Sequence, residues 1–330
     1  MRCLARASVF AVLFLIAPAA PALAQSEVAG WLSPRIGGLA PRADYRIGQL
    51  DDRPVHGRGG QLGATRHEFT LLVPVAQGDV GEWSVSFRGR LDDVDTGVRL
   101  PDTGDPFPDE LWDLRAGVTY RRRVRRDWIG TLSVTGGSAS DRPFASLDEV
   151  IASATALLRI PHGYSNAWVA GLTWSNDRAF LNYVPIPLVG YWYQPVPDLL
   201  LFAGVPFLLI RTKPVEPLTF QVSYFPTTRV SAQLTYDVTQ RLALYAHFRT
   251  DEVRYLRADR ERRRDGLTFL DSRVAGGVRL ALGRQVALDL SAGYAFDKIV
   301  YEGEDFDDRD QNRLNIGDGL YWAASLSARF

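Results

Sequence analysis

The chain is poor in the residues that crosslink or anchor proteins. Its 330 residues contain one cysteine, Cys3, and after residue 24 there is no apolar run of the roughly 20 residues that a transmembrane helix needs. One cysteine excludes intramolecular disulfides and zinc sites built on several thiolates. The lack of such a run also argues against a helical membrane protein. The mean hydropathy of −0.10 is near neutral.

The chain also lacks an excess of either positive or negative charge. The chain has 38 basic and 38 acidic residues. Loss of the two arginines in the first 24 residues would leave a net charge of −2, which gives no general attraction to nucleic acid. Phosphate-loop, dinucleotide-binding and His-Glu-x-x-His motifs are missing too, so we expect no cofactor.

The first 24 residues have the three parts of a secretory signal peptide. Arg2 and Arg6 give a positive start, residues 8–17 form a short apolar centre, and Ala22-Leu-Ala24 fits a cleavage site. The alternative is a membrane anchor, but the apolar centre is too short to span a bilayer. We expect cleavage after Ala24, which leaves a mature chain without cysteine.

From residue 64 onward, apolar and polar residues alternate with a period of two, which is typical of strands with one apolar face. Gly- and Asp-rich turns separate the alternating segments. The clearest segments are 68–75, 82–91, 114–121, 128–134, 150–160, 168–174, 218–224, 230–236, 242–249, 273–280, 286–296 and 320–330.

This pattern predicts an all-β fold, a transmembrane antiparallel up-and-down β-barrel of about 12 strands, with 14 as the alternative. Aromatic residues near strand ends and connections that alternate between tight and long favour a barrel over a soluble sandwich. A sheet in lipid must close, because every backbone polar group needs a partner. We expect a signal peptide at 1–24, a periplasmic or plug segment at 25–62 and the barrel domain at 63–330. Residues 43–50 are a possible further strand, and 186–212 is hard to divide.

The last strand ends on an aromatic residue. Trp322, Leu326 and Phe330 lie on its apolar face. This arrangement resembles the C-terminal assembly signal of outer-membrane β-barrels. The resemblance implies recognition by the barrel assembly machinery and a place in the bacterial outer membrane, in contact with its lipids and lipopolysaccharide.

A second resemblance lies in the middle of the chain. It is carried by Trp174-Ser-Asn-Asp177, Pro185-Ile-Pro-Leu-Val-Gly-Tyr-Trp-Tyr-Gln-Pro-Val-Pro-Asp198 and Leu201-Phe-Ala-Gly-Val-Pro-Phe207. These segments resemble an uncharacterised family of predicted proteobacterial outer-membrane β-barrels, porin-like and of unknown function. The family is known by its fold, so the resemblance implies no catalytic residues.

The polar faces of the predicted strands are rich in arginine. If they line water, they favour anions and predict a passive pore for small solutes. A structural or surface-interaction barrel with a filled lumen is the alternative, because arginine also pairs with carboxylates inside closed barrels. The candidate lumenal residues are Arg88, Arg115, Arg121, Arg241, His247, Arg249, Arg273, Arg279 and Arg329.

Two further motifs fit a specialised site only partly. His162 and Ser165 resemble the His-x-Ser-Asn motif of outer-membrane lipid A deacylases, but they are three residues apart instead of two. A lipid hydrolase is therefore a second alternative, and we expect no enzyme. Asp308, Asp310 and Asn312 match the start of a calcium loop, whereas Arg313 stands at its glycine position. We therefore expect a solvated loop and no metal site.

Overall fold

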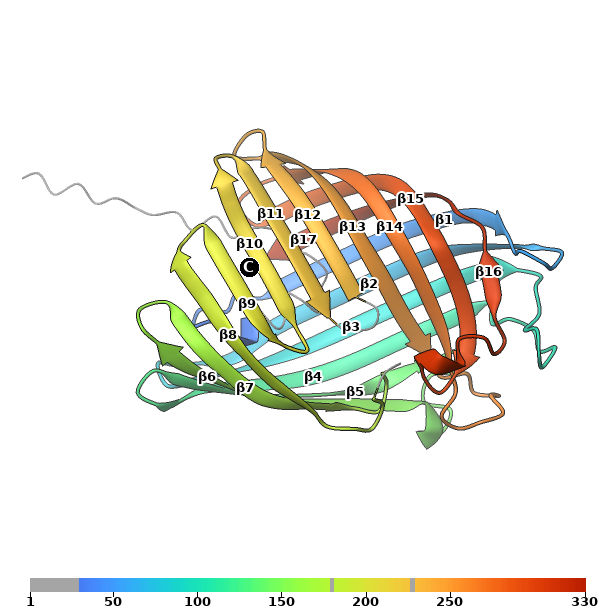
Figure 1. Cartoon of the computed structure of the whole chain (residues 1–330), viewed down its shortest axis with the longest axis horizontal. Coiled ribbons are helices and arrows are strands. Elements are labelled where there is room, and N and C mark those ends of the chain that lie inside the picture. Colours follow the sequence, from blue (N-terminus) through green and yellow to red (C-terminus); the bar gives the residue numbers. More distant parts are fainter. Residues whose placement is uncertain (1–29, 179–180, 226–228) are drawn as a thin grey trace, which may run out of the picture. The chain divides into compact units, whose positions relative to one another are not determined.

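The computed structural model describes residues 30–178, 181–225 and 229–330. Residues 34–330 form one compact unit, an antiparallel sheet that closes on itself (Figure 1). Closure is made at the chain ends, because β1 pairs with both β2 and β17, and β15 pairs with β17. The predicted all-β antiparallel barrel is confirmed, while the expected signal peptide lies outside the described residues.

The wall strands follow the chain in order around the ring, and two short 3-10 helices lie in the connections. The elements are β1 (Arg42–Pro54), β2 (Gln61–Gln77), β3 (Gly81–Thr96), β4 (Glu110–Arg125), β5 (Trp128–Ser140), η1 (Leu147–Glu149), β6 (Val150–His162), β7 (Asn166–Ser175), β8 (Ile186–Val196), β9 (Leu199–Val205), β10 (Leu208–Val215), β11 (Leu218–Phe225), β12 (Arg229–Asp237), β13 (Leu242–Tyr255), β14 (Gly266–Ala281), β15 (Val286–Gly303), η2 (Phe306–Asp308), β16 (Leu314–Ile316) and β17 (Gly319–Arg329).

The predicted strand count of 12, or alternatively 14, is wrong, because the ring has 16 strands. The seventeenth strand, β16, adds three residues beside β15 and is not part of the ring, since β15 pairs directly with β17. Two errors explain the difference. The region 186–212 holds three strands, β8 to β10, and residues 42–54 form β1. The barrel wall therefore starts well before residue 63, within the segment expected to be periplasmic or a plug.

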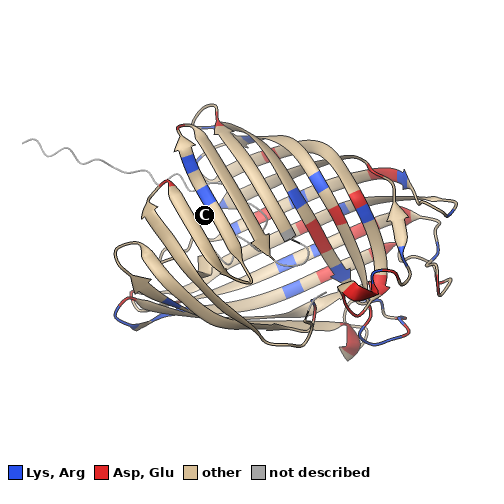
Figure 2. Ribbon diagram, viewed as in Figure 1, with Lys and Arg blue, Asp and Glu red and all other residues tan. Residues whose placement is uncertain are grey.

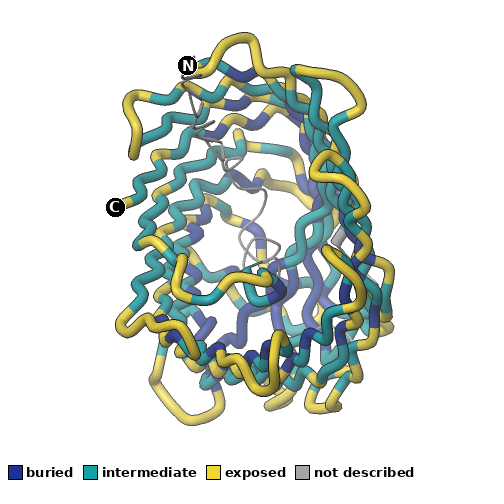
Figure 3. The backbone as a smooth tube through the Cα atoms, turned by 90° about the vertical axis from the view of Figure 1, so that its left-hand side faces the viewer, coloured by how far each residue is buried: buried dark blue, intermediate teal, exposed yellow. Residues whose placement is uncertain are grey.

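The two faces of the strands sort by exposure as their alternation predicts. On β17, Leu320 is 63% exposed and Trp322 44%, whereas the intervening Tyr321 is 4% exposed. Figure 3 shows the same alternation along the backbone, with exposed residues gathered in the turns. The outer face is thus apolar and uncovered, as expected of a sheet that faces lipid.

The two ends of the barrel differ. At one end, here called the short-turn end, a tight turn joins each even-numbered strand from β2 to β14 to the strand that follows it. The opposite, long-loop end carries the connections 97–109, 141–149, 256–265 and 304–318. Wall height varies as well, because β9 to β12 have 7 to 9 residues while β14 and β15 have 16 and 18.

Aromatic rings project outward close to the short-turn end. Trp83 stacks on Tyr120 with ring centroids 4.3 Å apart, and Trp168 lies 4.7 Å from Tyr191. Such amphipathic rings favour the boundary between hydrocarbon and water. Among the described residues, no helix is long and apolar enough to cross a membrane.

Candidate functional site: the barrel lumen

Charged residues gather along β1 to β4 and β13 to β15 (Figure 2), and many of them lie on the inner face. The ladder register places them there: Arg88 faces Arg115 across β3 and β4, and Arg249 faces Arg273 across β13 and β14. Because facing residues of antiparallel strands share one side of the sheet, each such pair points into the lumen. Serine, threonine, glycine and glutamine occupy many inner positions of β5 to β7, β11 and β12, as in the pair Gln221 and Gln233.

Most inner arginines are bound to carboxylates. Each buried or half-buried carboxylate that the described strands turn inward has an arginine partner, and such paired charges attract a solute ion only weakly. The pairs and their N–O distances are Arg42–Asp44 (2.6 Å), Arg66–Asp92 (2.6 Å), Arg90–Glu68 (2.7 Å), Arg115–Asp113 (2.5 Å), Arg115–Asp177 (2.8 Å), Arg249–Asp251 (3.0 Å), Arg273–Asp271 (2.7 Å), Arg279–Asp289 (3.1 Å), Arg257–Glu302 (3.4 Å) and Arg121–Glu82.

The predicted lumenal residues can now be placed. Eight lie on the inner face: Arg88, Arg115, Arg121, His247, Arg249, Arg273, Arg279 and Arg329. His247 is hydrogen-bonded to the Tyr321 hydroxyl at 3.1 Å. Arg241 is different, because it lies exposed in the turn between β12 and β13 and not on the lumenal face.

Five inner cations make no ion pair within the described residues: Arg46, Arg159, Arg211, Lys298 and Arg329. The nine candidate lumenal residues include only Arg329 of these five, although the alternation also places Arg159 on a polar strand face predicted to be lumenal. Arg46 lies in β1, which the pattern indicated weakly, and Arg211 lies in the proline-rich region that was hard to divide. Lys298 follows Asp297, which has a φ of 52° and interrupts the alternation of β15.

Apolar residues close one part of the long-loop end. Inner residues of β2 to β6 and β13 to β15 meet residues from the long loops in a single buried cluster, here called the apolar cluster. Phe269 packs edge-on against Phe107 and Tyr255, with centroids 6.0 Å apart in both pairs. The cluster comprises Val55, Leu62, Val94, Val98, Leu100, Phe107, Leu111, Ala139, Ile151, Val253, Tyr255, Leu256, Leu267, Val300, Leu314 and Ile316, with Ala64 and Phe269 packed against it.

Hydrogen bonds donated by backbone N–H groups cross the ring at the same end. Leu256, just after β13, donates its N–H to the Ala139 carbonyl of β5 at 2.7 Å. The Ala258 N–H binds the Asp141 carboxylate at 2.8 Å. These bonds join opposite walls and separate the packed side of the ring from the side formed by β6 to β12. In the described part of the chain, β7 to β12 contribute no residue to the apolar cluster.

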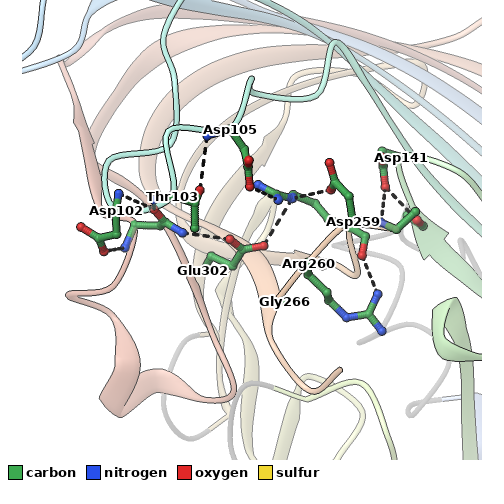
Figure 4. Close-up of polar contacts among 12 residues, drawn as sticks. Asp102, Thr103, Asp105, Asp141, Asp259, Arg260, Gly266 and Glu302 are labelled. Atoms are coloured by element: carbon green, nitrogen blue, oxygen red, sulfur yellow. Dashed lines mark hydrogen bonds and ion pairs between the residues drawn. The ribbon is translucent and has the colours of Figure 1, made fainter. Parts of the chain in front are cut away.

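A polar network holds the long loops together at this end (Figure 4). The buried Arg257 pairs with Asp105 at 2.9 Å, Asp259 at 3.1 Å and Glu302 at 3.4 Å. The hydrogen bond from Arg257 lowers the pKa of Asp105 below its usual range. Asn312 extends the network by donating to Glu302 at 3.0 Å. The connections after β3, β13 and β15 are therefore fixed to one another.

The two partly matched motifs have other contacts. The His162 ring is bonded to the Tyr191 hydroxyl at 2.8 Å, while the Ser165 hydroxyl donates to the Gln194 carbonyl. The structure therefore does not bring His162 and Ser165 together as a base and nucleophile. In the calcium-like loop, Asp310 pairs with Arg313 at 2.9 Å. Within the described residues, no group of three His, Cys, Asp or Glu side chains is placed to hold a metal ion.

The inner face of β8 to β10 differs from the rest of the lumen. Trp192 and Phe202 face each other across β8 and β9, and Phe202 faces Leu209 across β9 and β10. Their exposed fractions of 7%, 6% and 7% show that the three side chains bury one another. Around these three residues both faces of the wall are therefore apolar, which explains the nearly continuous apolar run in the sequence.

No family model and no curated protein matches this chain. Among solved structures, it is similar to an outer-membrane channel from Pseudomonas putida F1, with 10% identity, a TM-score of 0.39 and coverage of 91% of this chain and 98% of that one. A Pseudomonas aeruginosa FadL homologue gives 12% identity and 0.38, covering 92% and 98%. The β domain of the Bordetella autotransporter BrkA gives 12% and 0.34, covering 88% and 100%. TM-scores this low give no basis for assigning a function.

Proposed function

We propose that the chain is an outer-membrane β-barrel through which small solutes pass passively, with a preference for anions. The membrane location is supported by the closed ring, the uncovered apolar outer face and the outward aromatic rings at the short-turn end. A ring of 16 strands is also wide enough for an aqueous channel that wall side chains do not fill.

One observation carries the anion preference: the inner carboxylates are bound by arginine, whereas five inner cations have no carboxylate partner in the described residues. The fixed charge left uncompensated in the lumen is therefore positive. In a narrow pore with low-dielectric walls, such charge raises the local concentration of anions. It also repels cations, and the two effects together set selectivity.

The route that fits the geometry runs along β6 to β12, since the apolar cluster closes the other side of the long-loop end. Two of the unpaired cations lie on this route, Arg159 on β6 and Arg211 on β10. Arg159 is 5% exposed and its Nε has no hydrogen-bond partner among the described residues. We therefore expect these two arginines, more than the paired Arg249 and Arg273, to determine selectivity.

The test is the reversal potential of the purified protein in a planar bilayer under a potassium chloride gradient. Replacement of both arginines, Arg159→Gln with Arg211→Gln, should lower the chloride-to-potassium permeability ratio by about two-fold or more, because it removes two uncompensated charges. Arg241→Gln is the matched control, since Arg241 is exposed in a turn, and it should leave the ratio unchanged. An unaltered ratio in the double variant would contradict the proposed route.

A structural barrel with a closed lumen is the second candidate, and the apolar cluster favours it. The loops that form this cluster are tied together by Arg257 and Asn312. Conductance in a planar bilayer distinguishes the two functions. A protein that migrates as a folded barrel on an unboiled gel but shows no conductance steps has a closed lumen.

A further inference from the structure

A small cavity of about 60 Å³ lies inside the barrel below the apolar cluster. Its lining combines apolar residues with basic side chains from five strands: Arg46 of β1, Arg66 of β2, Arg249 of β13, Arg273 of β14 and Lys298 of β15. Basic groups from strands so far apart in the sequence meet here only because the ring closes.

The charges around this cavity do not balance. Asp92 binds Arg66, Asp271 binds Arg273, Asp251 binds Arg249 and Glu68 binds Arg90. Among the described residues this leaves Arg46 and Lys298 without an acid. Neither cation is isolated from charge. Arg46 is attracted by Glu68 and Asp251, which already bind other arginines, and is repelled by Arg249 and Arg273. Lys298 is attracted by Asp271 and repelled by Arg273 and Arg66.

Lys298 is the more unusual of the two. It is 7% exposed, and its Nζ has no hydrogen-bond partner in the described part of the chain. The Nε of Arg249, beside the same cavity, also has no partner there. A buried charge without a partner is strongly unfavourable, so such groups are normally paired or bind a ligand. Two donors without partners beside one cavity therefore indicate a missing acceptor.

We propose that this cavity binds a small tetrahedral oxyanion of the phosphate or sulfate class, held by Arg46 and Lys298 with Arg249 and Arg273 beside it. The proposal deepens the proposed passage of anions, on which it rests, by giving the lumen a saturable site. Two unpaired cations match the charge of a divalent anion, and guanidinium groups suit its several oxygens.

The size of the cavity limits the ligand. One water needs about 10–15 Å³ of volume measured with a water-sized probe, so 60 Å³ holds roughly four to six waters. A phosphate or sulfate ion has five heavy atoms and fits, whereas a sugar phosphate or a nucleotide exceeds this volume.

The experiment is isothermal titration calorimetry of the full-length protein in detergent micelles, with phosphate, sulfate and chloride added in turn at constant ionic strength. The wild type should bind phosphate and sulfate saturably and chloride at least about ten-fold more weakly, because chloride brings one charge instead of two. Arg46→Gln and Lys298→Met should each weaken phosphate binding about ten-fold or more, as loss of one charged hydrogen-bond donor predicts. Arg329→Gln is the control, since Arg329 is also a lumenal cation without an ion pair in the described residues but does not line the cavity, and it should bind as the wild type does.

Lys298→Met also separates a binding role from a structural one. Because it removes a buried charge without a partner, this variant should be at least as stable as the wild type in phosphate-free buffer. Absence of saturable phosphate or sulfate heat in the wild type would overturn the site, as would wild-type affinity in both cavity variants. Binding in micelles requires no conduction, so the two proposals can fail separately. A protein that binds phosphate but gives no conductance would refute only the pore. A conducting protein that binds neither phosphate nor sulfate would refute only the site.

Discussion

At the scale of single residues, Asp92 joins two opposite walls of the ring. Its carboxylate accepts two hydrogen bonds from Arg66, at 2.6 and 2.8 Å, and one from the Tyr255 hydroxyl at 2.7 Å. Asp92→Asn removes the charge of a buried carboxylate and leaves the half-buried Arg66 guanidinium without its counter-ion. Loss of one partner of a buried pair costs about 3–5 kcal/mol, and we expect a loss of that size in the free energy of unfolding.

Guanidinium titration of the protein folded into lipid vesicles measures this loss. Asp51→Asn is the matched control, because Asp51 is 54% exposed and lies 3.5 Å from Arg53. An exposed pair of this kind contributes less than about 1 kcal/mol. Equal losses in the two variants would show that the pair across the lumen contributes no more than a surface pair.

The charged residues of the lumen show how much of the candidate site can be predicted from the sequence. Alternation places Arg249, Arg273 and Arg279 on the inner face because side-chain direction depends only on parity along a strand. The same parity places Asp251 and Asp271 two residues away on the same face. It cannot show a pair such as Arg66 and Asp92, because these residues lie on different strands. The free cations, and with them the candidate site, depend on this pairing across strands, which requires the register.

At the scale of elements, the contact between β14 and β15 requires a glycine. A Cβ added to Gly293 would lie 2.1 Å from the Val274 carbonyl oxygen, whereas one added to Gly276 would find its nearest atom at 3.8 Å. We expect Gly293→Ala to push the two strands apart and to cost roughly 1–3 kcal/mol. Gly276→Ala, on the outer face, should change stability by no more than about 0.5 kcal/mol.

The fraction of each protein that keeps its folded migration on unboiled gels across a urea series measures this difference. Identical urea midpoints for the two variants would contradict the close approach at Gly293. Both changes add one methyl group to a glycine in neighbouring wall strands, so the difference between them reports the packing and not the composition.

Element boundaries were predictable where one face of a strand is apolar and the other is polar. β17 and β13 meet this condition. The range of β17 agrees with the predicted 320–330 to one residue at each end, and β13 starts at the predicted residue 242 but continues six residues beyond the predicted end at 249. β8 to β10 do not, because Trp192, Phe202 and Leu209 make the inner face as apolar as the outer one. Without alternation, neither the number of strands nor their ends could be read. The twelve clear segments leave out β8 to β10, and they also leave out β1.

At the scale of the whole molecule, the long loops decide whether the ring is a channel or a closed container. The connection between β3 and β4 supplies Val98, Leu100 and Phe107 to the apolar cluster. Replacement of residues 98–107 by a short glycine linker should therefore open the packed side of the long-loop end. We expect single-channel conductance to rise about two-fold or more, because a 16-stranded ring without its inward loop is a wide aqueous pore.

The control for this deletion is a linker in place of residues 257–259, which removes Arg257 and its ties to Asp105 and Glu302 but leaves every residue of the apolar cluster in place. If the cluster itself limits the current, this second variant should conduct close to the wild-type level. If both variants conduct equally more, the polar ties keep the end closed and the cluster only fills space. If neither differs from the wild type, the ions follow β6 to β12 alone, and selectivity then depends on Arg159 and Arg211 without any contribution from the packed side.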